Sequence, residues 1–275
     1  NRFEWGLGWN YASYMDRVTA EGKKHYDIPV FVNAWIVQPE DSHPGNYPSG
    51  GPQAQNHDIW RAAAPHIDIL SPDIYLNDFP EILDLYSRNN NPVFVPESRA
   101  GQNGAANAAY AIGQGGAIGY SPFGFEGSCD AEENATFCEL YRKLGTISEK
   151  VLSAQAEGRI GAAWLKGSDP MIVKNDIVLS NVRITCELVS SGMRNGGAPQ
   201  LTGGTYNPDD EGYVIAIEEG DTLLFLGSNA RVTFRPADGD KVIGLAYWGA
   251  IDYLGESQGW PAKGWEQGVI DISLE

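Results

Sequence analysis

Hydrophobic residues in the first half of the chain recur in two alternating patterns. Four short runs of apolar, β-branched and aromatic residues are typical of buried strands. Between these runs lie segments with apolar residues at helical spacing, ended by glycine or another breaker. The predicted strands are residues 29–37, 67–75, 92–96 and 117–121, and the predicted helices are residues 10–22, 54–64, 80–87, 105–114 and 139–155. This alternation, with a spacing of roughly 25–35 residues, predicts βα units and a parallel sheet.

The pattern changes after residue 157. Short runs of alternating apolar and polar positions follow one another there, separated by clusters of Gly, Asn and Asp. These runs are residues 160–165, 171–179, 182–189, 213–217, 222–226, 231–234, 241–248 and 269–272. We therefore predict two domains, an α/β part at residues 1–157 and an antiparallel, sandwich-like all-β domain at residues 158–275.

Composition narrows the classes of partner. The 275 residues carry a net charge of −17, so neither nucleic acid nor an anionic membrane is an expected partner. No apolar run approaches the roughly 20 residues that span a bilayer, and the first residues lack the pattern of a signal peptide. The four histidines show no metal-ligand spacing, so we expect them at the surface or in loops. We expect no metal and no cofactor.

Three cysteines leave one unpaired. Cys129 and Cys138 either form a disulfide around an acidic loop or remain free thiols, and Cys186 is the third. One N-glycosylation sequon begins at Asn134, and together with the acidic composition it indicates an extracellular or periplasmic protein.

The loops after the predicted strands carry the candidate chemistry. The loop after the first strand, beginning Gln38-Pro39-Glu40-Asp41, has no GxGxxG spacing, which disfavours a nucleotide-binding sheet. Long polar loops after parallel strands are instead typical of barrel enzymes. Glu97 ends the apolar run of PVFVPESR, where a barrel enzyme carries an active-site acid. The alternative is a helix-capping or surface glutamate.

Three segments extend this argument to a family. They are VNAWIVQPEDSHPGNYPSGGPQAQNHDIWRAAAPHIDILSPDIYLNDF, NPVFVPESR and NAAYAIGQGGAIGYSPFG. Residues 9–127, which contain them, resemble the second half of the barrel of glycoside hydrolase family 35. The nearest likeness is to the branch of β-galactosidases with a C-terminal β-domain. The β-region after residue 158 resembles that appended domain more loosely.

The resemblance implies a fold and a pair of catalytic positions. The four predicted strands would be strands five to eight of a TIM (β/α)8 barrel, followed by the β-domain. Glu97 would then end the seventh strand, the position of the nucleophile of a retaining glycosidase. Tyr75, at the end of the sixth strand, would hydrogen-bond the nucleophile and orient it; the alternative is a tyrosine that caps the barrel rim.

Further residues are candidates for substrate binding. Polar and aromatic side chains at strand ends suit sugar hydroxyls and ring faces. The candidates are Asn33, Trp35 and Gln38 after the fifth strand, Tyr47 in the NYPSGG loop, Phe123 after the eighth strand, and Glu126. Core packing is the alternative for Trp35 and Phe123.

The resemblance also implies a missing partner. The family's Asn-Glu pair, which carries the acid/base, would precede residue 1, and Glu4 does not follow an apolar strand as that acid should. We therefore expect the N-terminal half of the barrel as a separate segment or chain. A half-barrel alone would expose two sheet edges and an apolar inner face.

These expectations converge on a carbohydrate-active enzyme. The leading hypothesis is a secreted retaining exo-glycoside hydrolase, a β-galactosidase that releases terminal β-galactose from oligo- or polysaccharides. The alternatives are a non-catalytic fragment with a sugar-binding groove and a carbohydrate-binding role for the β-domain alone.

Overall fold

A computed structural model describes residues 2–37, 43–125, 128–169, 171, 173–189, 209–220 and 222–237, with the backbone of three further strands. The chain divides into two compact units. Unit 1 comprises residues 1–99 and 115–125, and unit 2 comprises residues 100–114 and 126–275. The predicted domain boundary at residue 157 is therefore not the boundary between these units. Three helices that precede it group with unit 2, namely Gly101–Gly113, Ala135–Thr146 and Ser148–Glu157.

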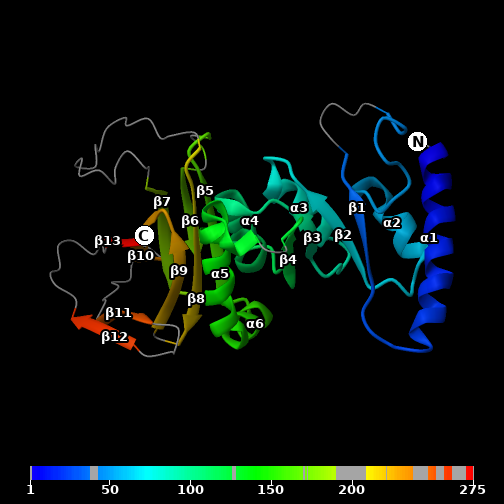
Figure 1. The fold of residues 1–275 in the computed structure, drawn as a ribbon. Coiled ribbons are helices and arrows are strands. Elements are labelled where there is room, and N and C mark those ends of the chain that lie inside the picture. Colours follow the sequence, from blue (N-terminus) through cyan, green and yellow to red (C-terminus); the bar gives the residue numbers. More distant parts are fainter. Residues whose placement is uncertain are drawn as a thin grey trace. The chain divides into compact units, whose positions relative to one another are not determined.

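Unit 1 is built on a parallel four-stranded sheet (Figure 1). Its strands are β1 (Phe31–Trp35), β2 (Ile69–Ile74), β3 (Phe94–Ser98) and β4 (Gly119–Pro122), paired in the order β1-β2-β3-β4. Its helices are α1 (Arg2–Lys23), the 3-10 turn η1 (Ala54–Asn56), α2 (His57–Ala63) and α3 (Phe79–Ser87). The predicted parallel sheet with helices is confirmed.

Apolar packing places helices on one side of this sheet. Trp60 of α2 and Ala12 of α1 are buried together with Leu70 of β2, and Val32 of β1 packs against the same cluster. All six residues of β2 are buried. A strand so enclosed needs a continuous apolar run, which explains why the sequence pattern identified it.

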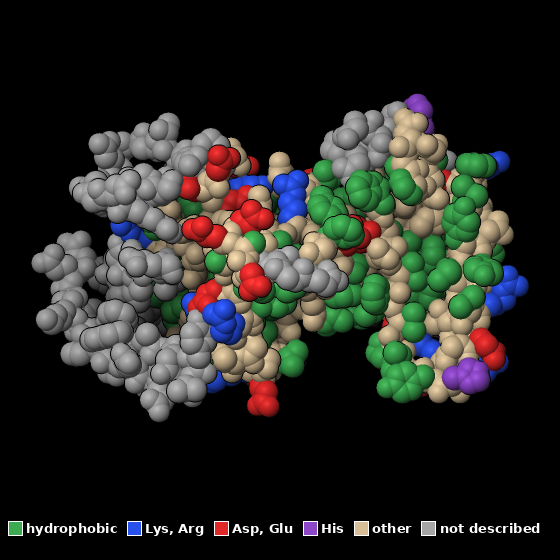
Figure 2. Space-filling model, in the orientation of Figure 1, with side chains coloured by type: hydrophobic (Ala, Val, Ile, Leu, Met, Phe, Trp, Pro, Cys, Tyr) green, Lys and Arg blue, Asp and Glu red, His purple; other side chains and the backbone are tan. Residues whose placement is uncertain are grey.

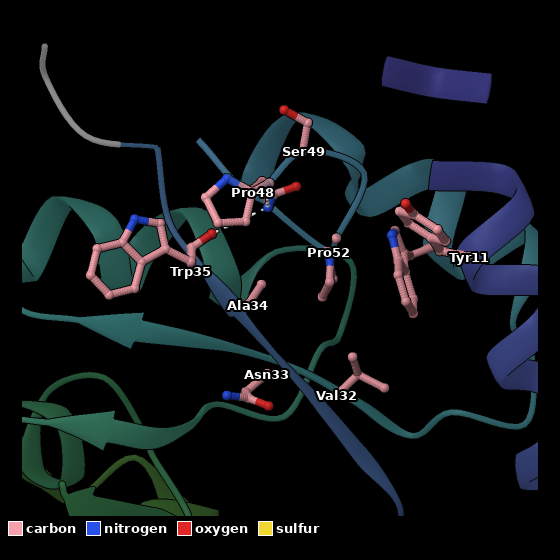
Figure 3. Close-up of a pocket in the computed structure, with 11 residues that line it drawn as sticks. Tyr11, Val32, Asn33, Ala34, Trp35, Pro48, Ser49 and Pro52 are labelled. Atoms are coloured by element: carbon pink, nitrogen blue, oxygen red, sulfur yellow. Dashed lines mark hydrogen bonds between the residues drawn. The ribbon is translucent and has the colours of Figure 1, made fainter. Parts of the chain in front are cut away.

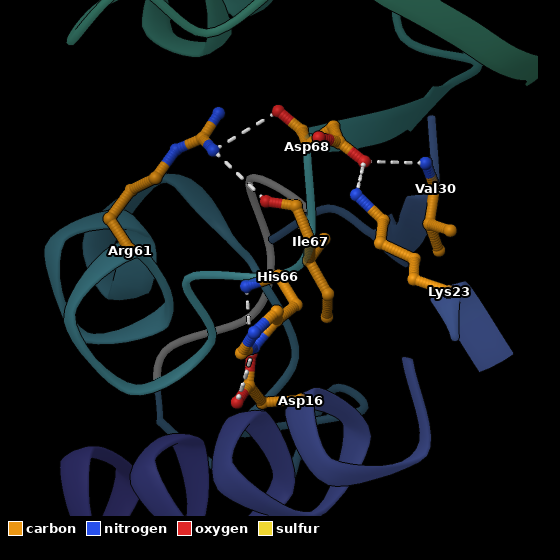
Figure 4. Close-up of polar contacts among 7 residues, drawn as sticks. All are labelled: Asp16, Lys23, Val30, Arg61, His66, Ile67 and Asp68. Atoms are coloured by element: carbon orange, nitrogen blue, oxygen red, sulfur yellow. Dashed lines mark hydrogen bonds and ion pairs between the residues drawn. The ribbon is translucent and has the colours of Figure 1, made fainter. Parts of the chain in front are cut away.

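Charged residues fix the entry into the first two strands (Figure 4). Lys23 at the end of α1 pairs with Asp68 at 2.6 Å, and the same carboxylate accepts the backbone N–H of Val30 at 2.7 Å. Burial favours protonation of Asp68, but the bonds from Lys23 and Val30 outweigh it and lower the Asp68 pKa. Arg61 of α2 donates to the carbonyl oxygens of Ile67 and Asp68. These contacts tie both helices to the beginnings of β1 and β2.

Unit 2 combines helices with antiparallel sheets. Its helices are α4 (Gly101–Gly113), α5 (Ala135–Thr146) and α6 (Ser148–Glu157), with 3-10 turns η2 (Ser128–Asp130) and η3 (Glu132–Asn134). The strands are β5 (Ile160–Lys166), β6 (Lys174–Val178), β7 (Val182–Leu188), β8 (Glu211–Glu219), β9 (Thr222–Ser228), β10 (Ala230–Pro236), β11 (Tyr247–Ile251), β12 (Ser257–Pro261) and β13 (Asp271–Leu274). They pair as β5-β8-β9, β13-β10-β7-β6 and β11-β12.

The predicted antiparallel sheets are confirmed, and two of them share a core. One hydrophobic cluster includes Leu165 of β5 and Val214 of β8 together with Ile184 of β7 and Val232 of β10. The alternating apolar positions of these strands therefore face a common interior.

Several predicted boundaries are wrong. Residues 139–155 are not one helix, because the chain leaves helical geometry at Ile147 (φ −117°, ψ 18°) between α5 and α6. Helix α1 begins at Arg2 rather than at residue 10, since no proline or cap interrupts its first turns. Strand β12 has no predicted counterpart, and residues 241–246 of a predicted run lie outside the described residues.

The cysteine alternatives resolve in favour of a disulfide. Cys129 and Cys138 are bonded, with Cα atoms 5.8 Å apart, and Cys186 is a buried free thiol. Burial raises the pKa of Cys186 to about 12, so this thiol is unreactive. Asn134 of the sequon is buried in the folded chain and is poorly placed for glycosylation. None of the described helices has the length and apolarity needed to cross a membrane.

Candidate active site

The carboxyl ends of β1, β2 and β3 bring polar side chains to one face of the sheet. Trp35 is the register partner of Asp73, and Asp73 is the register partner of Glu97. Side chains of register partners point to the same face, as do residues two apart on one strand. Asn33 and Tyr75 therefore join these three residues.

Glu97 has a defined partner in this group. Tyr75 donates its hydroxyl hydrogen to Glu97 Oε1 at 2.9 Å, the contact that the family resemblance implies. Burial, and then the bond to Glu97, raises the pKa of Tyr75 far above its usual value. Tyr75 is consequently a protonated donor at neutral pH.

Asp73 places a second carboxyl group beside Glu97. Its side chain is only 6% exposed, and Asn33 Nδ2 donates to its two oxygens at 3.1 and 3.0 Å. Burial raises the pKa of Asp73 to about 6, the Asn33 bond opposes this shift, and the charge of Glu97 adds to it. Asp73 is not among the site residues predicted from the sequence. The sequence signal that could have identified it is an acidic residue inside an otherwise apolar strand.

A hydrogen-bond network holds β3 in place next to Glu97. Ser98 is buried and donates its hydroxyl hydrogen to the carbonyl oxygen of Ile74 on β2. Tyr120 of β4 shares its hydroxyl hydrogen between Ser98 Oγ and the carbonyl oxygen of Arg99, each at 2.8 Å. The network joins three strands at the level of Glu97, and sequence reasoning missed both hydroxyl residues.

Two exposed aromatic residues, Trp35 and Phe123, lie at the ends of β1 and β4. Trp35 is 42% exposed, and its ring lies 6.3 Å from that of Tyr75, tilted by 31°. Phe123 is also exposed, and its backbone N–H donates to the carbonyl oxygen of Ser98 at 2.9 Å. Core packing is therefore excluded for both Trp35 and Phe123 in this structure. An exposed indole beside polar groups is a suitable platform for a sugar ring.

An open cavity of about 300 Å³ lies between β1 and the PSGGP loop (Figure 3). Asn33 and Trp35 line it together with Pro48, Ser49 and Tyr11. Gln53 fastens the loop to the strand, since its amide donates to the carbonyl oxygens of Trp35 (3.2 Å) and Pro48 (2.5 Å).

Three predicted binding residues have a different outcome. Tyr47 is buried, and its hydroxyl donates to Glu4 Oε1 at 3.0 Å, so its ring is part of the loop's own packing and is not exposed to a ligand. Gln38 and Glu126 lie outside the described residues.

Glu4 itself forms a separate buried cluster. Its Oε1 also accepts hydrogen bonds from Gln55 at 3.0 Å and Asn56 at 3.4 Å. These neutral donors link α1 to the loop before α2. The structure does not bring Glu4 into the group around Glu97.

Among the described residues, no group of three or more His, Cys, Asp or Glu side chains is arranged to hold a metal ion. His57 is buried in α2, which corrects the expectation that it lies at the surface or in a loop. Burial, followed by the charges of Arg88 and Arg61, lowers its pKa to about 4, so it is neutral at physiological pH.

Unit 2 contains a segment of the chain that matches a known family profile. The sequence profile of a domain of unknown function, DUF5597, matches residues 137–252. The curated proteins gave no match to the chain. The matched residues cover less than half of the chain and do not include Glu97, Tyr75 or Asp73. The matched domain carries no assigned activity, so any functional argument depends on the site in unit 1.

Proposed function

We propose that this chain is the nucleophile-bearing part of a retaining exo-glycoside hydrolase of the family 35 type, acting on terminal β-galactosides. The observation that carries the proposal is the hydrogen bond from Tyr75 to Glu97 at the carboxyl end of a parallel strand. Barrel enzymes place their catalytic residues at this end of the strands. The exposed Trp35 beside these residues offers a sugar-binding surface.

The order of the parallel strands supports the proposal that unit 1 is half of a (β/α)8 barrel. Each parallel strand pairs with the one before it, as in a (β/α)8 barrel, whereas a nucleotide-binding sheet reverses its order at a switch point. The proposed fold is therefore strands five to eight of a barrel, followed by a β-sandwich whose two sheets share the core of unit 2.

Exposed apolar side chains support the idea that a complementary half covers unit 1. Phe31 of β1 is 45% exposed although it belongs to a parallel strand, and such strands are normally covered on both faces. Helix α1 also exposes Trp9 and Tyr14. Figure 2 shows hydrophobic side chains gathered over this helix. The proposed cover is the first half of the barrel, which would carry the acid/base.

The proposed reaction has two steps. Glu97 attacks the anomeric carbon, forming an ester bond while the glycosidic C–O bond breaks and the leaving oxygen takes a proton from the acid/base. Water then attacks the anomeric carbon, gives its proton to the acid/base, and releases Glu97 as a carboxylate. In this reaction Tyr75 positions Glu97, because its hydroxyl donates a hydrogen bond to Glu97 Oε1.

Hydrolysis of an aryl β-galactoside tests this function. The chain supplied with its acid/base half should release the aryl group, and Glu97→Gln should lower kcat by roughly three or more orders of magnitude. Glu81→Gln on the exposed side of α3 is the matched control and should leave kcat unchanged. A tenfold or smaller loss in Glu97→Gln would remove Glu97 as the nucleophile. Turnover by this chain alone would contradict the need for a separate acid/base.

A further inference from the structure

A second carboxyl group lies at the level of Glu97 in the sheet. Asp73 on β2 and Glu97 on β3 are register partners, and neighbouring strands are about 4.8 Å apart. The two side chains therefore leave the same face side by side. Because Asp73 is buried and held through both oxygens by Asn33, it cannot turn away into solvent.

The surroundings do not neutralise this pair. Among the described residues, no Lys, Arg or His forms an ion pair with Asp73 or Glu97. The titratable groups that interact with Asp73 are Glu97 from β3, Tyr75 after the same strand and Tyr86 from α3, while β1 contributes the uncharged Asn33 and Trp35. Two carboxylates in such a site repel each other, and the buried one is the harder to ionise.

We propose that Asp73 is a positioning residue that acts on the proposed reaction through Glu97, by placing a second negative charge beside the nucleophile. This inference rests on the proposed function. Attack by Glu97 turns its carboxylate into a neutral ester and so removes the repulsion between the two groups. An ionised Asp73 therefore favours formation of the glycosyl-enzyme and disfavours its hydrolysis, which restores the charge on Glu97.

The effect depends on pH in a defined direction. The pKa of Asp73 is raised to about 6, by burial first and by the charge of Glu97 in addition. Below this pH Asp73 is neutral and the second charge is absent, whereas above it the charge is present. The rate of glycosyl-enzyme formation should accordingly rise through the region around pH 6.

A titration without substrate tests the coupling of the two carboxyl groups. In the chain labelled with ¹³C at aspartate carboxyl carbons, the Asp73 signal should titrate near pH 6. Glu97→Gln should lower that pKa, because it removes the like charge, whereas Ser71→Ala on the same buried strand should not move it. Titration of Asp73 near pH 4, unaffected by Glu97→Gln, would overturn the proposal.

Kinetics of the chain with its acid/base half test the role in the reaction. Asp73→Asn keeps the shape and should lower kcat/KM for an aryl β-galactoside roughly tenfold above pH 7, and it should abolish the rise near pH 6. Asp73→Glu should restore a rise, and Ser71→Ala should retain the wild-type profile. An unchanged profile in Asp73→Asn overturns the positioning role while the proposed function stands. A wild-type enzyme that does not hydrolyse the substrate overturns the proposed function and, with it, the role of Asp73 in the reaction. The titration then still shows whether the two carboxyl groups are coupled.

Discussion

At the residue scale, Glu97 is held by one donor and faced by one acid. Tyr75 donates to its Oε1, and Asp73 lies next to it on the neighbouring strand. In the proposed reaction the hydroxyl would position the nucleophile, and the acid would add a charge whose repulsion is relieved when Glu97 attacks the sugar. Ser98 and Tyr120 help to position Glu97, because their hydrogen bonds fix β3 to the strands on either side.

Replacement of the tyrosine tests the first of these contacts. Tyr75→Phe should lower kcat about tenfold to a hundredfold, since a hydrogen bond to a charged group contributes on the order of 1.5–3 kcal/mol. The measurement is kcat for an aryl β-galactoside in the chain with its acid/base half. Tyr26→Phe, at an exposed position after the end of α1, is the control. A Tyr75→Phe enzyme with wild-type kcat would show that the bond has no catalytic role.

At the element scale, the sheet of unit 1 depends on polar contacts where its strands begin. Asp68 joins Lys23 at the end of α1 to the backbone of Val30 just before β1. The Asp68 carboxylate therefore links the end of α1 to the beginnings of β1 and β2. Its partly exposed position limits the free energy that this ion pair contributes.

Removal of this carboxylate should give an acid-dependent loss of stability. The pKa of Asp68 is lowered in the folded state, so its contribution is present above the unfolded pKa of about 4 and is lost as pH falls through the folded pKa. Asp68→Asn should cost about 1 kcal/mol in urea unfolding at pH 7 and almost nothing near pH 2. Glu21→Gln, which disrupts an exposed pair with Lys24, should cost less at pH 7. Equal free energies of unfolding for wild type and Asp68→Asn at pH 7 would contradict this account.

Helices and strands were predictable from the sequence where a single physical effect, such as burial, determines which residue types occur. Strand β2 is enclosed on all sides, so its continuous apolar run identified it directly. The break at Ile147 was not predictable, because apolar positions continue at helical spacing through it and only the backbone geometry separates α5 from α6.

The candidate site was predictable in part for a similar reason. Glu97 was found because an acid ends an apolar run, whereas Tyr47 was misjudged because its partner, Glu4, lies far away in sequence. Asp73, Ser98 and Tyr120 act through pairing between strands, and the sequence does not give the register that aligns them.

At the scale of the whole molecule, unit 1 carries exposed apolar side chains at its sheet. Phe31 and Ile118 are exposed although both lie in or beside parallel strands. Exposed apolar groups of this kind mark a surface that packs against another segment. The acid/base that the proposed reaction needs would arrive with that segment.

The chain without its proposed partner should therefore associate with itself. Sedimentation velocity should show oligomers that the double substitution Phe31→Lys/Ile118→Lys reduces, because two charges disrupt the apolar surface. Val178→Lys, at an exposed apolar position of β6, is the control and should leave the distribution unchanged. A strictly monomeric wild-type chain that binds no hydrophobic dye would argue against an uncovered half-barrel.

The proposed function requires Glu97 to form a covalent bond to the sugar, and trapping that bond is the decisive experiment. The chain with its acid/base half is incubated with a 2-deoxy-2-fluoro-β-galactoside that has a dinitrophenyl leaving group, then digested and analysed by mass spectrometry. We expect one added fluorogalactosyl group, located at Glu97 on the peptide that contains PVFVPESR. Labelling of Asp73 or of another carboxylate, or turnover without any adduct, would contradict it.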